Sequence, residues 1–155
     1  MGFLYAEITF SQRICHIKIK KEKIMLNNPK HGWCDFKLND FTGTPSYLTD
    51  VPIDILNAFI SFHENGYGMV CFDEEGKEFS LVLTLYGVYI IEEREETQLL
   101  HNFSWSSVKD LEKEVISDIE QDIDAWGLFA TSDSEEDIRE HKEEILRKIN
   151  LLKNK

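Results

Sequence analysis

Alternating apolar and polar residues predict β-strands in the first third of the chain. In the segment 14–19, apolar residues at positions 15, 17 and 19 alternate with His16 and Lys18. This period of two is typical of a half-buried strand. The segments 5–10 and 33–41 alternate in the same way, and the polar stretches 27–32 and 42–46 predict turns or loops.

A helix is predicted after these strands. Asp50 can cap its start, Pro52 is tolerated in the first turn, and Asn65-Gly66 ends it. The apolar residues between them recur at helical spacing. These residues are Ile55, Leu56, Phe59, Ile60 and Phe62.

The middle of the chain has the pattern of a β-meander. We predict strands at 68–72, 77–85, 88–92 and 98–103, with tight turns at 73–76 and 86–87. Apolar residues at every odd position from Phe79 to Leu85 predict that the second of these strands buries one face firmly.

Two helices are predicted at the end of the chain. Ser107 and Asp110 resemble a capping box at the start of a helix over 107–126, and Ser132 or Ser134 starts the final helix. The first of these helices carries an apolar stripe at helical spacing, formed by Val108, Leu111, Val115, Ile119, Ile123 and Trp126. We therefore expect one α+β domain over residues 1–155, with an antiparallel, mostly meandering sheet of four to six strands and about three helices packed on one face.

Composition supports a folded protein without a membrane span. The chain has 155 residues, of which 42% are hydrophobic, so it can bury a substantial core. Its start lacks the charged and apolar regions of a signal peptide, and no apolar run reaches 18 residues. Cys15, Cys34 and Cys71 show no metal-binding spacing, and we expect buried free thiols. The expected compartment is the cytoplasm.

The charge of the chain is strongly asymmetric. Residues 64–144 contain 23 Asp or Glu and six Lys or Arg, whereas residues 1–31 contain six Lys or Arg and two acids. Such an acidic field repels nucleic acid and anionic lipid and attracts basic proteins. The basic stretch Lys18–Lys23 departs from this pattern, and it could form a second contact or an edge strand protected by lysines.

The acids of the predicted helix 107–126 have no obvious cations to pair with. Seven acids lie between Asp110 and Asp124 with Lys113 as the only cation, although like charges four residues apart destabilise a helix. A solvated face is one explanation, and a surface that waits for a basic partner is the other. On the second explanation, the partner-binding residues are Asp73, Glu74, Glu75, Glu78, Glu112, Asp118, Glu120, Asp122, Asp124 and Trp126.

No catalytic or metal-binding motif accompanies the acids. The five histidines are scattered, and the turn Asp73–Glu78 fails the calcium-loop order because Gly76 comes too early. Fingerprints of serine hydrolases and nucleotide-binding loops are absent. We therefore expect no metal, no cofactor and no catalytic residue.

Three segments together resemble the small acidic immunity proteins that bacteria encode beside polymorphic or contact-dependent toxins. The segments are Asp50–Leu56, Cys71–Phe79 and Asp122–Gly127. The resemblance implies a cytoplasmic protein that neutralises a cationic toxin, often a nuclease, by covering its active site or a nearby patch.

Two other functions stay open from the sequence. An enzyme without a short motif could use Asp73, Glu78 and His101 if the meander brings them together. A regulatory or structural subunit could instead dock through the acidic helix. A toxin gene beside the gene of this protein would favour the immunity function over both.

Overall fold

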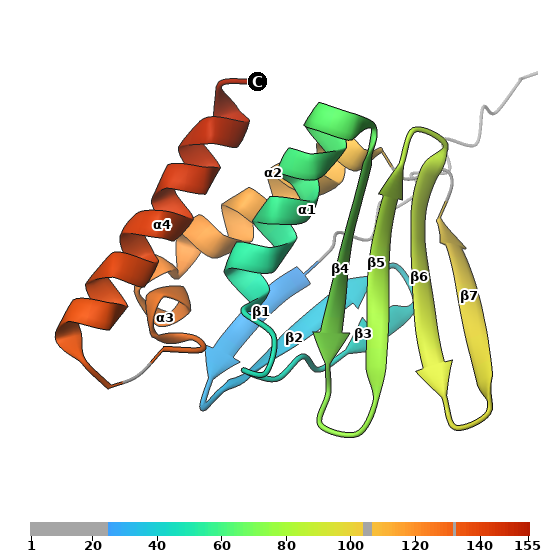
Figure 1. The fold of residues 1–155 in the computed structure, drawn as a ribbon, viewed down its shortest axis with the longest axis horizontal. Helices are drawn as coiled ribbons and strands as arrows, with labels where there is room; N and C mark the ends of the chain where they lie inside the picture. Colours follow the sequence, from blue (N-terminus) through green and yellow to red (C-terminus); the bar gives the residue numbers. More distant parts are fainter. Residues whose placement is uncertain (1–24, 104–106, 132) are drawn as a thin grey trace, which may run out of the picture.

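The computed structural model describes residues 25–103, 107–131 and 133–155, which form an α+β fold with two antiparallel sheets (Figure 1). The fold class predicted from the sequence is confirmed. The strands, however, divide between a three-stranded and a four-stranded sheet. The strands predicted at 5–10 and 14–19, and with them the basic stretch Lys18–Lys23, lie outside the described residues.

The smaller sheet consists of β1 (Met25–Lys30), β2 (Trp33–Leu38) and β3 (Phe41–Gly43) in sequential order. The loop predicted at 27–32 is therefore mostly strand. Its polar residues lie on an edge strand with an irregular register, where Pro29 is tolerated. The predicted strand 33–41 is interrupted at Asn39, whose φ of 52° makes the tight turn into β3.

The larger sheet is the predicted meander. It consists of β4 (Tyr67–Asp73), β5 (Glu78–Thr84), β6 (Gly87–Arg94) and β7 (Thr97–Phe103), paired in that order. One face is buried by apolar residues at alternate positions, as predicted for β5. In the core, Phe36 and Phe41 of the smaller sheet contact Phe79 of the larger one, with ring centroids 5.2 and 5.0 Å apart.

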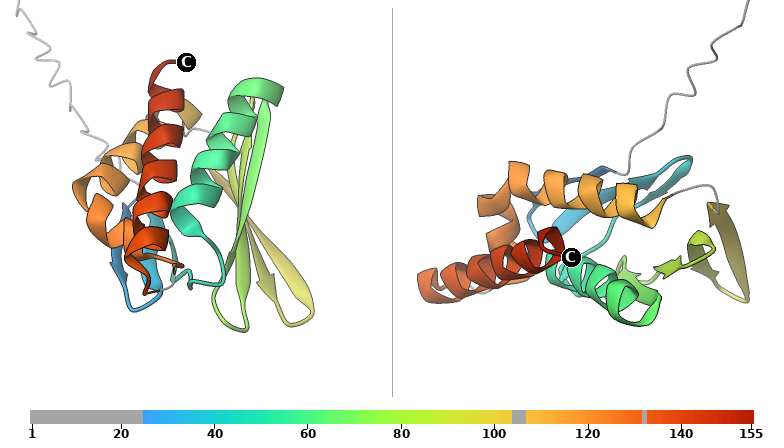
Figure 2. Two further views of the ribbon diagram at one scale, coloured as in Figure 1. Left: turned by 60° about the vertical axis from the view of Figure 1, so that its left-hand side comes forward. Right: turned by 90° about the horizontal axis from the view of Figure 1, so that it is seen from above.

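Helix α1 (Val51–Asn65) covers part of the same buried face (Figure 2). Asp50 caps its start and Gly66, with a φ of 73°, ends it, as predicted. The helix approaches β4 so closely that a Cβ atom at Gly68 would lie 1.9 Å from the Ala58 carbonyl oxygen. Only glycine fits at this contact.

The predicted helix 107–126 is two helices, α2 (Val108–Gln121) and α3 (Ile123–Leu128). The chain turns at Asp122, whose φ of −137° is not helical. This turn directs Trp126 into the core, where it is fully buried and packs on Phe129. The stripe of α2 is buried as predicted, and Ser107 caps the helix by accepting from the Asp110 amide.

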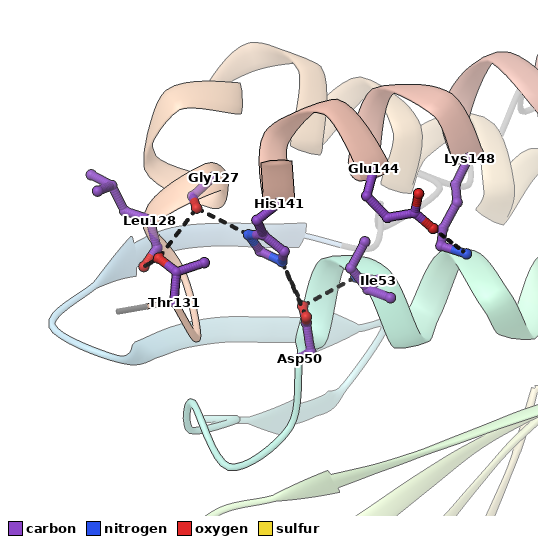
Figure 3. A network of polar contacts seen from close by, with 8 residues as sticks. All are labelled: Asp50, Ile53, Gly127, Leu128, Thr131, His141, Glu144 and Lys148. Carbon is purple, nitrogen blue, oxygen red and sulfur yellow. Dashed lines mark hydrogen bonds and ion pairs between the residues drawn. The ribbon is translucent and has the colours of Figure 1, made fainter. Parts of the chain in front are cut away.

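Helix α4 (Glu135–Lys153) is capped by Ser134, one of the two predicted starts, and contacts the other helices through His141. The Nδ1 atom of His141 lies 2.9 Å from the Gly127 carbonyl oxygen, and its Nε2 atom lies 3.0 Å from the Asp50 carboxylate (Figure 3). Both partners accept hydrogen bonds, so two protonated ring nitrogens satisfy them best. The contact links the start of α1 to α3 and α4.

Candidate partner-binding surface

The predicted partner-binding acids lie in two separate regions of the fold. The turn between β4 and β5 is at the lower end of the larger sheet in Figure 1, whereas α2 lies behind α1 and α4. The two regions do not form one continuous surface. Each is therefore considered by itself.

The acids of α2 and α3 have partners within the fold, contrary to the expectation from the sequence. Glu120 pairs with Lys153, and Asp124 pairs with Lys142. Glu112 is only 7% exposed and lies 2.6 Å from His63. The cations come from α1 and α4, which are remote in sequence, so the composition of α2 alone could not reveal them.

The remaining predicted residues of this region are less suited to binding a partner than expected. The carboxylate of Asp118 accepts a hydrogen bond of 3.0 Å from the Leu26 amide and so fixes β1 to α2. Trp126 is fully buried and cannot contact another protein, which corrects its predicted role. Asp122 is exposed at the junction of α2 and α3. Most of the helical acids thus have structural roles.

The other acids gather at one end of the larger sheet. Because alternate turns of a meander lie at the same end, the β4–β5 turn and the β6–β7 turn are neighbours there (Figure 1). We call this end the acidic tip, and its acids are Asp73, Glu74, Glu75, Glu78, Glu93, Glu95 and Glu96. The cations here are Lys77 and Arg94, which border a shallow hollow of about 300 Å³, and Arg94 pairs with Glu92.

Two carboxylates of the acidic tip are held against each other. Phe79 pairs with Glu92, so Glu78 and Glu93 are the next residues along the adjacent strands β5 and β6. The hydrogen bond and the negative charge of Glu93 raise the pKa of the Glu78 carboxyl above its ordinary value. Among the described residues, no Lys, Arg or His forms an ion pair with either carboxylate. This pair is therefore an acidic site at the surface without an ion-pair partner in the described part of the chain.

The sheet face beside Glu78 is open and partly apolar. Tyr67, Met69 and Leu100 are 48%, 51% and 61% exposed, and Val82, Tyr89 and Ile91 lie between them half-buried. We call these six residues the open face. In Figure 2 no described helix or strand covers this side of the sheet. The acidic tip thus forms one edge of an exposed apolar patch.

Cys71 also lies on this side of β4. Its side chain is exposed, and its Sγ atom is 3.6 Å from the Glu78 carboxylate, so the expectation of a buried thiol is wrong for this residue. Cys34 is buried as expected, and burial raises its pKa to about 12. Cys15 lies outside the described residues. Cys71 can therefore report on the accessibility of the open face.

Of the three residues considered for catalysis, Asp73 and Glu78 are cross-strand partners in β4 and β5, but His101 is not brought to them. His101 points to the buried side of the larger sheet, where it lies 3.0 Å from Glu92 and packs on Phe41. Glu78 points to the other side of the same sheet. Within the described part of the chain, no cluster of three or more His, Cys, Asp or Glu is placed to hold a metal ion.

The sequence prediction missed Glu93, Glu95 and Glu96 and the open face. The predicted meander contained the signal for the three acids, because its first and third turns must share an end of the sheet. The sequence signal for the open face was weaker, because apolar residues on both faces of β5 and β6 are also usual in strands that are covered on both sides.

Comparisons of the chain with models of protein families, with curated proteins and with solved structures found no match. Among the helices of the described residues, none is both long enough and apolar enough to cross a membrane.

Proposed function

We propose that this protein is a non-enzymatic binding protein of the immunity type, which neutralises a cationic toxin domain by tight association. A nuclease is one such domain, because its substrate-binding surface must be basic. The expected compartment is the cytoplasm, where such a toxin acts. The binding surface consists of the acidic tip and the open face.

The observation that carries this proposal is the Glu78–Glu93 pair beside the open face. The two carboxyl groups lie opposite each other on adjacent strands, and the hydrogen bond between them together with the negative charge of Glu93 raises the pKa of Glu78. A Lys or Arg side chain from a partner would pair with these groups. An arginine is the better match, because its planar donors can bind two carboxylate groups at once.

The open face supplies the apolar centre that a protein interface needs in addition to charge. Interfaces bury an apolar centre, often with Tyr and Met, and surround it with a polar rim. Tyr67, Met69 and Tyr89 match the centre, and the acidic tip matches the rim. The apolar centre sets the dissociation rate, while the acids speed and orient the encounter.

The acids of α2 and α3 contribute to this function mainly through the long-range field. Glu120 and Asp124 are already paired with lysines of α4, so their contact with a partner would first break an internal ion pair. This pairing also disfavours the alternative of a subunit that docks through α2. The acidic tip lacks such internal pairs at Glu78 and Glu93.

The experiment is protection of bacterial growth. A basic toxin domain, which the proposal predicts to be encoded beside the gene of this protein, is expressed together with the wild-type protein or with a variant. We expect growth with the wild type and with Glu120→Lys/Asp124→Lys, and toxicity with Glu78→Lys/Glu93→Lys. The two variants change the net charge equally, so only the position of the charges differs.

Circular dichroism and expression level show that each variant folds. Protection by the acidic-tip variant equal to that of the wild type would contradict the proposed surface. Toxicity in the presence of the wild-type protein would contradict the proposed function.

A further inference from the structure

A groove between helices α1, α2 and α4 has an apolar floor and a basic rim. Its volume is about 620 Å³, and its floor is formed by Phe62, Val108, Ile116 and Leu152. The last three of these side chains are buried, with at most 8% of their surface exposed. The groove runs along α2 where the C-terminal ends of α1 and α4 approach it, and Figure 2 shows how these three helices are arranged.

The rim carries the opposite charge to the protein as a whole. Lys109 and Lys113 lie one turn apart on α2, and Lys153 and Lys155 face them from the end of α4. The whole chain has a formal charge of −12, so four lysines around one groove are a local exception. The groove is therefore a second surface, opposite in charge to the acidic tip and formed by other residues.

The carboxylates in the groove do not cancel all of these lysines. Glu112 is bound to His63, and Glu120 is bound to Lys153. Lys155 reaches Glu64 at 3.5 Å. Lys109 and Lys113 form no ion pair within the described part of the chain, and both are exposed. These two ammonium groups are the ones that can bind an anion.

We propose that this helix groove binds a small amphiphile, a molecule with an aliphatic or aromatic body and a single anionic headgroup. The apolar body lies on the floor, and the headgroup is held by Lys109 and Lys113. Small-molecule sites in proteins typically enclose about 300–1,000 Å³ and combine an apolar lining with a few charged groups. The groove has both properties.

Charge and shape favour a free small molecule over larger anions. A membrane or a nucleic acid would bring many negative charges close to a protein of charge −12, which opposes binding. A small molecule with one charge meets only the local field of the lysines. Three helices also enclose the groove on its sides, which suits a compact ligand.

The test is a titration of the full-length protein with decanoate, followed by calorimetry and by displacement of the fluorescent sulfonate 8-anilinonaphthalene-1-sulfonate. We expect saturable binding of one decanoate per protein and weaker binding of decanol, which has the same chain without the charge. Lys109→Gln/Lys113→Gln should weaken decanoate binding by about tenfold. Lys30→Gln/Arg139→Gln removes two exposed cations outside the groove and should leave binding unchanged.

A second variant tests the floor without opening the core. Ser117 is exposed and lines the groove, so Ser117→Trp should fill it and abolish binding of both decanoate and the dye while the protein stays folded. Three results would each overturn the proposal: equal binding of decanol and decanoate, unchanged binding by both groove variants, or sedimentation with phosphatidylglycerol vesicles in place of decanoate binding. Failure here would leave toxin neutralisation unaffected, because the acidic tip and the helix groove share no residue.

Discussion

The imidazole of His141 lies 3.0 Å from the carboxylate of Asp50, the residue that caps helix α1. The same ring contacts the carbonyl oxygen of Gly127, so one side chain connects three helices. Burial lowers the pKa of His141, but the hydrogen bonds to Asp50 and Gly127 and the charge of Asp50 outweigh this effect and raise it above 6.5. The protonated ring therefore stabilises the fold.

This pKa predicts how the stability depends on pH. The contribution of His141 should be complete below pH 6.5, the ordinary pKa of the unfolded chain, and should be lost as the pH rises through the higher pKa of the folded state. We expect wild-type stability in urea to decrease more than that of His141→Gln as the pH rises above 6.5. Asp50→Asn keeps the cap but removes the charge, and should fall between them. Parallel pH profiles of wild type and His141→Gln would contradict the role of this contact.

Ile119 tests the position of α2 on the core. Its side chain is fully buried, so Ile119→Ala should lower the free energy of unfolding by about 2–5 kcal/mol. Leu128→Ala, at a side chain that is 58% exposed, is the control and should cost less than about 0.5 kcal/mol. Chemical denaturation measures both. A cost below about 0.5 kcal/mol at Ile119 would mean that the helix presents another face to the core.

Trp126 belongs to the core, and its substitution should act on stability. Trp126→Ala should lower the free energy of unfolding by about 3–5 kcal/mol, because it leaves a cavity next to Phe129. Under conditions where the variant is folded, its dissociation rate from a partner should equal that of the wild type. Normal stability combined with faster dissociation would instead place Trp126 in the interface.

The two described cysteines should differ in reactivity. Cys71 is exposed and should react with N-ethylmaleimide in the folded protein, whereas Cys34 is buried, has a pKa of about 12 and should react only after unfolding. Mass spectrometry of the digested protein identifies the labelled residue, and Cys71→Ser is the control. A bound toxin domain should protect Cys71. Rapid labelling of Cys34 in the folded protein would contradict the structure. Rapid labelling of Cys71 in the complex would contradict the proposed interface.

Local patterns allowed much of the fold to be predicted. The caps at Asp50, Ser107 and Ser134 and the meander from β4 to β7 depend on neighbouring residues, and they are confirmed. The division into two sheets and the break at Asp122 depend on contacts between distant segments, which periodicity does not reveal.

The same difference explains the outcome for the candidate site. The turn acids from Asp73 to Glu78 are placed by a local hairpin, and the structure leaves several of them at the surface. Whether the helical acids are free to bind a partner depends on where α4 lies, because its Lys142 and Lys153 pair with Asp124 and Glu120. A charge count along one helix cannot show cations that another helix supplies.

The most direct test of the proposed function is the rate of association with a basic toxin domain, which the proposal predicts to be encoded beside this gene. The rate is measured by stopped-flow fluorescence at about 50 mM and about 500 mM salt. Glu78→Lys/Glu93→Lys and Glu120→Lys/Asp124→Lys are compared, because they change the net charge equally. We expect association of the wild type to be fast and strongly slowed by salt. The loss of rate should be several-fold larger in Glu78→Lys/Glu93→Lys than in Glu120→Lys/Asp124→Lys. Equal rates at the two salt concentrations, or equal losses in the two variants, would contradict an interface centred on Glu78 and Glu93.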